Sequence, residues 1–436
     1  MNSKAISKIQ SIILIAVIVV GVVAGAAAYV LLGGQTQSSE TIKIGILADI
    51  DGINGKDILQ GAKLAAEQLN ADGGILGRQI EVIGEDNDHE QGIDMVVISN
   101  ALTRLITHHK VDFILGQAGG QSALTCQDIS SEHKKIYFSA IGNIEEVTQR
   151  VLDDYDKYKY YFRFGLNSTA STIGYSSSID CLRENTGFNK VGYLGVDRGW
   201  TKGLMDDMDI ILPEVYGFDL VYKGRFPLGT FDFSSYFAAA EAAGVEILVP
   251  LIGLDSAIPF LKEYYDRQSP MVVYSGVLLS VTSSEGWEWT DGKCEHIAVK
   301  GYPTVAGFPL TSKTLTFREA YINRWGEPPS NPSTSGYDIV RFILSDAIKR
   351  AGSIETDAVI EALEETRIET SSVQDFVFTD SHDTMVSENL NDPEAIHMLT
   401  MLFQWQNGVQ VPIYPKEIME EAGATYTFPD WPGPWD

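Results

Sequence analysis

Residues 42–83 read IKIGILADIDGINGKDILQGAKLAAEQLNADGGILGRQIEVI, and this stretch decides the fold class. Its two ends, residues 42–47 and 80–83, are short runs rich in β-branched and aliphatic residues, a composition typical of buried strands. Residues 56–70 repeat apolar side chains at helical spacing, and Gly73 follows as a helix terminator. A strand, a helix and a strand in this order predict a βαβ unit, in which a helix joins two parallel strands.

The same alternation of strand and helix continues through most of the chain. Further strands are predicted at residues 111–115, 135–139, 190–194, 219–222, 245–249 and 271–274. Helical patterns separate these strands, and the region after Tyr302 is mainly helical until Arg367. Two successive sets of βαβ units predict an α/β protein with two doubly wound parallel-sheet lobes.

The size and charge of the chain narrow the possible function classes. A length of 436 residues exceeds one compact core, so two domains are expected. The formal net charge of -27 repels phosphate backbones, so we expect no nucleic-acid partner and a body that stays monomeric. Cys126, Cys181 and Cys294 allow at most one internal disulfide, and whether one forms stays open.

The N-terminal segment has the features of a membrane span. Residues 12–32 are an unbroken apolar run without charge, long enough to cross a bilayer as a helix. Lys4 and Lys8 precede it, and positive charge on a short flank keeps that end in the cytoplasm. We expect residues 1–40 to form a retained transmembrane helix and linker that hold the body at the extracellular face of the cytoplasmic membrane. Small residues at 24–26 leave a cleaved signal peptide open, in which case the body is secreted.

An ordered series of motifs carries a family resemblance from about Ile42 to about Trp405. It includes a helix with a glycine-rich exit at residues 60–78, the segment 139–148 after the fourth strand, and a late helical motif at 336–338. The series resembles the type I periplasmic binding proteins of the leucine/isoleucine/valine-binding branch. The resemblance implies a protein that captures a small molecule between two lobes and delivers it to an ABC permease with separate ATPase subunits.

The resemblance also implies how the chain divides between the lobes. Lobe 1 is expected to contain residues 41–166 and 303–370, and lobe 2 residues 167–302 and 371–436. Three segments then cross the hinge, an arrangement that suits opening and closing around a ligand.

A candidate ligand-binding loop follows the third predicted strand. Ligands in open α/β sheets bind beyond the carboxyl ends of the strands. The loop contains Gly119 and Gly120, where backbone can approach a ligand closely, and Gln121 or Ser122 opens a helix. Free N–H groups at a helix start favour an anionic group such as a carboxylate. The alternative is an ordinary turn in which Ser122 caps the helix.

Further candidates follow the fourth strand and two strands of lobe 2. Ile141 and Gly142 lead to Asn143, which matches a family position that helps hold a ligand carboxylate; the alternative is a turn residue. Trp200 stands where the family often has an aromatic residue that covers the ligand, with lobe packing as the alternative. Asp255 is a candidate partner for a ligand ammonium, or a solvated residue at a helix start.

The identity of the ligand stays open. Amino-acid binders of this family usually place an acid after the strand that corresponds to residues 271–274, where it pairs with the ligand ammonium. Here residues 275–279 read SGVLL. A buried ammonium without a partner is costly, so amino acids, amides and small carboxylates all remain candidate ligands.

No catalytic residue, metal site or cofactor is expected. The sequence lacks a nucleophile elbow, a zinc-protease motif and a phosphate loop, and the acidic stretch 86–90 lacks the spacing of a calcium loop. Two other function classes stay open. One is a ligand-sensing ectodomain that acts with a separate membrane signalling partner, and the other is an exported α/β enzyme.

Overall fold

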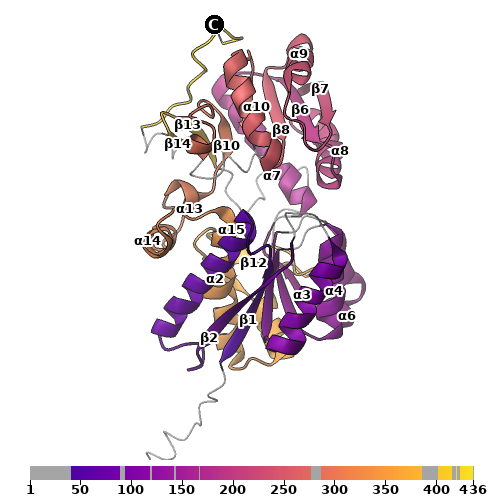
Figure 1. Cartoon of the computed structure of the whole chain (residues 1–436), viewed down its shortest axis with the longest axis vertical. Coiled ribbons are helices and arrows are strands. Elements are labelled where there is room, and N and C mark those ends of the chain that lie inside the picture. Colours follow the sequence, from indigo (N-terminus) through magenta and orange to yellow (C-terminus); the bar gives the residue numbers. More distant parts are fainter. Residues whose placement is uncertain are drawn as a thin grey trace, which may run out of the picture.

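The protein folds into two α/β lobes, each built around one main β-sheet (Figure 1). The computed structural model describes residues 41–88, 94–117, 120–141, 144–165, 167–275, 286–384, 401–414, 419 and 423–435.

Lobe 1 contains a five-stranded sheet in which all neighbouring strands are parallel. In spatial order the strands are β2 (Ile80–Asp86), β1 (Ile42–Ala48), β3 (Phe113–Gln117), β4 (Ile136–Ile141) and β5 (Tyr161–Arg163). The first four confirm the predicted strands. The sequence pattern does not predict β5, because three residues are too few for a periodic signal.

Helices cover both faces of this sheet. One face packs against α2 (Ile53–Ala71), α14 (Thr314–Trp325), α15 (Asn331–Asp338), the π-helical segment η2 (Ile339–Leu344), α16 (Ser345–Ala351) and α17 (Thr356–Glu364). The other face packs against α3 (Met95–Arg104), the π-helical segment η1 (Leu105–His109), α4 (Gln121–Glu132) and α5 (Glu146–Asp153), with α6 (Tyr155–Tyr158) beside them. Successive strand residues point to opposite faces, so the lobe has two separate apolar cores.

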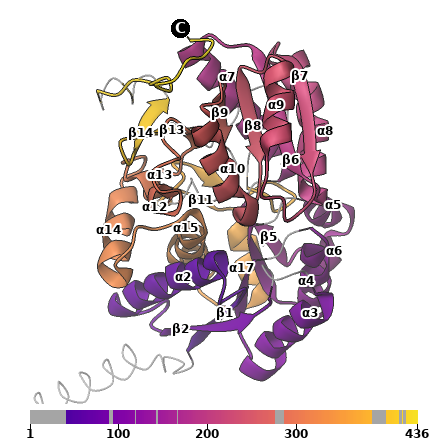
Figure 2. The same cartoon turned by 45° about the horizontal axis from the view of Figure 1, so that its top comes forward.

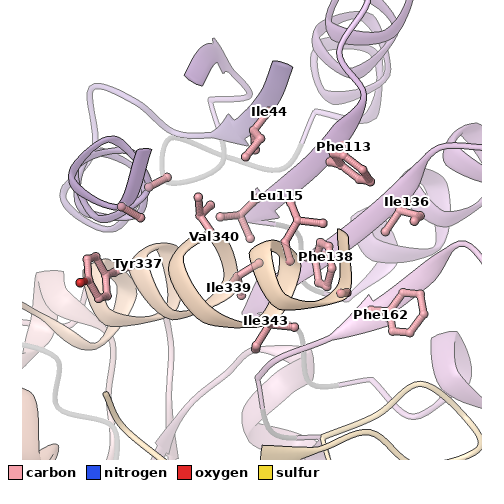
Figure 3. Packing of buried hydrophobic residues seen from close by; sticks show 14 of the residues in the cluster. Ile44, Phe113, Leu115, Ile136, Phe138, Phe162, Tyr337, Ile339, Val340 and Ile343 are labelled. Atoms are coloured by element: carbon pink, nitrogen blue, oxygen red, sulfur yellow. The ribbon is translucent and has the colours of Figure 1, made fainter. Parts of the chain in front are cut away.

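The core under α2 and η2 joins distant parts of the sequence. Ile44 of β1 and Leu115 of β3 belong to the same buried cluster as Ile339 and Val340 of η2 (Figure 3). Helices α2 and α15 lie side by side in this layer (Figure 2). The late helical region therefore completes the core of a sheet that the start of the chain has built.

The end of α15 fixes the extended segment that follows α17. Asp338 is buried, and its carboxylate accepts the N–H groups of Ser371 and Ser372, each at 3.1 Å. The two serine hydroxyls donate to the same carboxylate at 2.5 and 2.6 Å. Burial raises the pKa of Asp338, although the hydrogen bonds oppose the shift. These contacts hold the turn between β11 (Arg367–Ile368) and β12 (Phe376–Val377) against lobe 1.

Lobe 2 contains a seven-stranded sheet whose parallel part repeats the strand order of lobe 1. The parallel strands are β7 (Asp219–Phe226), β6 (Lys190–Val196), β8 (Ile247–Leu251), β9 (Val272–Ser275) and β10 (Ala298–Lys300). Next to β10, the strands β13 (Leu402–Gln406) and β14 (Val409–Tyr414) run antiparallel. The predicted parallel sheet is confirmed for β6 to β9, and β10 and the antiparallel edge are added to it.

Two helix layers sandwich the sheet of lobe 2. Helices α7 (Ser168–Thr186) and α8 (Gly199–Glu214) cover one face, and α9 (Ser234–Ala242) and α10 (Leu254–Arg267) cover the other. The short helix α12 (Gly286–Trp289) lies near the second face. Cys126, Cys181 and Cys294 are all buried and free, so no disulfide forms.

The chain crosses between the lobes three times. The crossings lie between β5 and α7, between β10 and α13 (Pro303–Ala306), and between β12 and β13. Phe376 and Phe378 are buried in the core of lobe 1. The chain therefore stays with lobe 1 beyond residue 371, the expected boundary, because these rings cover the first sheet.

The described residues contain no helix that is long and apolar enough to cross a membrane. The predicted span at residues 12–32 lies outside the described residues.

Candidate ligand-binding site

Buried polar side chains meet at the carboxyl ends of the central strands of lobe 1. The strand order changes direction between β1 and β3, and ligands bind beside such switch points in open α/β sheets. The side-chain oxygen of Gln117 accepts the N–H of Asp49 at 3.2 Å, and the Asn87 amide donates to the Gln117 carbonyl at 2.9 Å. The carboxylate of Asp49 accepts the N–H of Gly52 at 2.9 Å, before α2. The three side chains form a rigid polar edge on lobe 1.

The predicted ligand loop of lobe 1 lies beside this polar edge. Gly120 precedes α4 with a φ of 57°, a backbone conformation that glycine adopts without strain. Gln121 begins the helix and is exposed, whereas the Ser122 side chain is buried. Gln117 pairs with Ile141 of β4, so the loop and the end of β4 belong to one edge of the sheet. Of the remaining candidates here, Gly119, Gly142 and Asn143 lie outside the described residues.

The candidates of lobe 2 belong to helices that follow its own central strands. Strands β6 and β8 are neighbours, with Gly195 opposite Leu251. Trp200 is the second residue of α8, after β6, and Asp255 is the second residue of α10, after β8. The side chains of both residues lie outside the described part of the structure. Their helices therefore begin at the switch point of lobe 2, while their contacts with a ligand remain a prediction.

A buried ion pair stands at the first crossing between the lobes. Arg163, at the end of β5, is fully buried, and its guanidinium binds Asp383 through Nε at 2.7 Å and also through Nη2. The Asn167 amide, which caps α7, donates to the same carboxylate at 3.0 Å. In addition, the N–H of Thr169 donates to the Glu145 carboxylate at 2.8 Å. The first turn of α7 is thus tied to lobe 1.

Sequence reasoning missed a cationic site at the second crossing. Lys300 is the last residue of β10, and its ammonium faces the ring of Tyr175 at 5.4 Å from the centroid. A Cβ atom on Gly174 of α7 would lie 3.1 Å from the Lys300 Nζ, so the ammonium lies against the helix backbone. Burial lowers the pKa of Lys300 to about 8. The only available signal in the sequence was a lysine at the end of an apolar strand, and β10 itself was not predicted.

The lowered pKa of Lys300 predicts how stability depends on pH. Its folded-state pKa of about 8 lies below the value of about 10.4 in an unfolded chain. Between these values the unfolded chain binds more protons, so this lysine makes stability rise with pH from about 8, by at most about 1.4 kcal/mol per pH unit. Urea unfolding at pH 7 to 9.5 should show the rise in the wild type and not in Lys300→Met.

Ionisation of the neighbouring tyrosines changes stability in the opposite direction, and only at higher pH. Burial raises the pKa of Tyr175, Tyr274 and Tyr302, so their contribution to stability falls only as the pH exceeds the ordinary value for tyrosine. The difference between wild type and Lys300→Met below pH 9.5 therefore isolates the lysine. Parallel stability curves for the two proteins over that range contradict this assignment.

No group of three or more His, Cys, Asp and Glu residues that could hold a metal ion occurs in the part of the chain that the structure describes. Residues 89 and 90 of the acidic stretch lie outside it.

Two doubly wound lobes that share one strand order and are joined by three crossings define the type I binding-protein fold. A family model described as periplasmic binding protein matches residues 41–390. The chain is 23% identical over 400 residues to the "Leu/Ile/Val-binding protein homolog 7" of Brucella abortus (strain 2308), covering 88% of this chain and 94% of that protein.

Two solved structures share the fold. One is the branched-chain amino acid transporter substrate binding protein LivJ from Streptococcus pneumoniae in complex with isoleucine. It has a TM-score of 0.69 and 20% identity, and the match covers 86% of this chain and 100% of that chain. The other is a solute binding protein of an ABC transporter from R. palustris in complex with benzoate. It has a TM-score of 0.68 and 13% identity, with 86% and 96% covered.

The chain therefore belongs to the periplasmic binding protein family, in its leucine/isoleucine/valine-binding branch. The relatives are solute-binding proteins rather than enzymes, in agreement with the expectation from the sequence. Membership also supports a periplasmic or extracellular location for the body.

Proposed function

We propose that this protein is the substrate-binding component of an ABC importer and captures a small polar ligand between its two lobes. The observation that carries the proposal is the duplicated switch point. Each lobe directs the carboxyl ends of its central strands to one edge, and the chain leaves both sheets near those edges to cross to the other lobe. Ligand-driven closure requires only that the ligand binds the closed form more tightly than the open form.

Candidate ligands are amino acids, amides and small carboxylates, because residues 275–279 contain no acid that would pair with the ammonium of a free amino acid. Candidate ligand contacts are Gly119, Gly120, Gln121, Ser122, Ile141, Gly142, Asn143, Trp200 and Asp255. The loaded protein delivers its ligand to a permease and its ATPase subunits, and the N-terminal segment keeps the monomeric body at the membrane or directs its secretion.

A ligand screen by thermal melting tests the capture function. The full-length protein is heated with L-leucine, L-isoleucine, L-valine, small amides, urea and small mono- and dicarboxylates. A true ligand at 100 times its Kd stabilises the folded state by about 2.7 kcal/mol, which raises the melting temperature by a few degrees. The ligand should be recovered chemically unchanged. A flat screen across every class contradicts the capture function.

A matched pair of aromatic variants tests the position of the site. Trp200→Ala should weaken the binding of the identified ligand about tenfold or more by isothermal titration calorimetry, because a large aromatic ring supplies much of the apolar contact area in a closed site. Phe231→Ala is the control, since Phe231 is an exposed aromatic residue of the same lobe. Equal affinity in both variants contradicts the predicted site and leaves the capture function standing.

A further inference from the structure

The ammonium of Lys300 lacks a carboxylate partner. Among the residues that the structure describes, the Lys300 ammonium takes part in no ion pair and in no hydrogen bond, and it lies over the face of the Tyr175 ring. Lys300 is partly buried and lies against the backbone of α7 at Gly174. By contrast, the fully buried Arg163 is paired with Asp383. A cation held away from water without a counter-ion is costly and therefore calls for a reason.

A second polar group beside Lys300 is also unsatisfied. The hydroxyl of Tyr274 is fully buried and has no hydrogen-bond partner among the described residues. Tyr274 of β9 stands opposite Ala298 of β10, and Lys300 is two residues further along β10, on the same face of the sheet. Burial raises the pKa of Tyr274, the Ser178 side chain opposes this shift, and Tyr175 and Tyr302 add to it.

The chemistry of these two groups selects the kind of ligand. An ammonium is a donor only, and a phenol hydroxyl whose ring is buried also donates readily. Two unsatisfied donors on one face of a sheet suit an acceptor that carries negative charge, such as a carboxylate. The charge of the whole chain, -27, makes such a local cationic site an exception on this molecule.

The position of Lys300 places it on the side of lobe 2 that faces lobe 1. Lys300 ends β10, and the chain passes to α13 within three residues. Thr304 of α13 is hydrogen-bonded to Thr334 of α15 in lobe 1, at 2.9 Å between the hydroxyl oxygens. Gly174 lies six residues after Ser168, the start of α7, a rise of about 9 Å from the first crossing. The ammonium thus stands between two of the crossings.

We propose that Lys300, assisted by the hydroxyl of Tyr274, binds an acidic group at the end of the ligand that contacts lobe 2. This inference rests on the proposed capture function and narrows its ligand to organic anions that present a carboxylate to lobe 2.

Calorimetric titration of the full-length protein tests the inference. The probes are succinate and glutarate, with L-leucine and acetamide as ligands that have no acidic group for lobe 2. We expect a dicarboxylate to bind the wild type, Lys300→Met to weaken it about tenfold or more, and Tyr274→Phe to weaken it about threefold. Lys300→Arg should recover part of the loss. Lys293→Met is the matched control, because Lys293 of the same lobe pairs with Asp266 at 2.7 Å and should leave affinity unchanged.

The possible outcomes separate this inference from the capture function. If L-leucine or acetamide binds the wild type and Lys300→Met equally, the inference is wrong and the capture function stands. The same holds if a dicarboxylate binds both proteins equally. If no probe and no member of the wider ligand screen binds, the capture function itself fails. Thermal melting without ligand checks folding, and Lys300→Met should be at least as stable as the wild type at pH 7, because it removes a buried charge.

Discussion

Replacing Asp383 with alanine is expected to lower the free energy of unfolding by about 3 to 5 kcal/mol. Arg163 has no exposed surface, so the variant leaves a charged guanidinium buried without its counter-ion. Its other partners include the Ile144 carbonyl at 2.7 Å and the Thr148 hydroxyl at 3.0 Å, both of which are uncharged. The variant also removes an acceptor of the Asn167 amide at the first crossing, so the loss should spread to the start of α7.

Urea unfolding and native-state hydrogen exchange measure this loss. Exchange should accelerate most in peptides that contain β4 and β5, because Arg163 ends β5. Asp375→Ala is the matched control, since Asp375 lies in the same segment and also binds an arginine. Its partner, Arg367, is 73% exposed, and an exposed pair contributes about 1 kcal/mol or less.

A double variant distinguishes charge from packing at this site. Arg163→Met combined with Asp383→Leu removes both charges and should recover much of the loss, because a buried pair replaced by apolar side chains is often neutral. If Asp383→Ala costs no more than Asp375→Ala, the buried pair does not hold this part of the hinge.

Replacing Gly61 with alanine is expected to lower the free energy of unfolding by about 3 kcal/mol, which is at the upper end of the usual cost of overpacking a core. A Cβ atom at Gly61 would lie 1.9 Å from the carbonyl oxygen of Ser333, and a Cβ at Gly336 would lie 2.3 Å from that of Ile58. Both obstacles are backbone atoms, so no side chain can rotate away. Helices α2 and α15 must therefore separate, which disturbs the apolar core that both helices share with η2.

The helical Gly203 provides the matched control for Gly61. It lies in α8, and a Cβ there meets no heavy atom within 4 Å. Gly203→Ala should raise stability by up to about 1 kcal/mol, since alanine favours the helix over glycine. Thermal melting of both variants compares the same substitution with opposite expected signs. A melting temperature that rises for Gly61→Ala contradicts the close helix contact.

The fold was predictable from the sequence wherever the pattern of apolar residues was long enough. The strands β1 to β4 and β6 to β9 have clear apolar runs, and Gly73 and Gly74 end α2 with φ values of 98° and 83°. The structure explains why Gly61 and Gly336 are glycines, and the sequence could not, because their contact joins segments far apart in the chain. Short strands such as β5 and β10 and the late pair β13 and β14 depend on pairing with neighbours rather than on periodicity.

The sequence predicted the sheet edge that carries the candidate residues, whereas their contacts with a ligand remain a prediction. The rule that ligands lie beyond strand ends leads to the loop after β3 and the end of β4, and Gln117 and Ile141 are indeed paired there. Lys300 and Tyr274 could not be found this way. A sequence does not reveal whether a lysine lacks a counter-ion, because this depends on how the chain packs in three dimensions.

The apolar core of lobe 1 combines early and late parts of the chain, and this affects how the protein folds during its synthesis. A ribosome releases β1 to β5 first, but η2, Phe376 and Phe378 emerge only after nearly all of lobe 2. Until β10 has emerged, α2 is the only one of the described helices available to cover this face of the first sheet, and the sheet of lobe 2 lacks β13 and β14. Contacts between such distant segments slow folding, and the unfinished sheets expose apolar surface while the chain grows. The nascent chain should therefore remain unfolded long enough to depend on chaperones, the state in which a general secretion channel accepts a polypeptide.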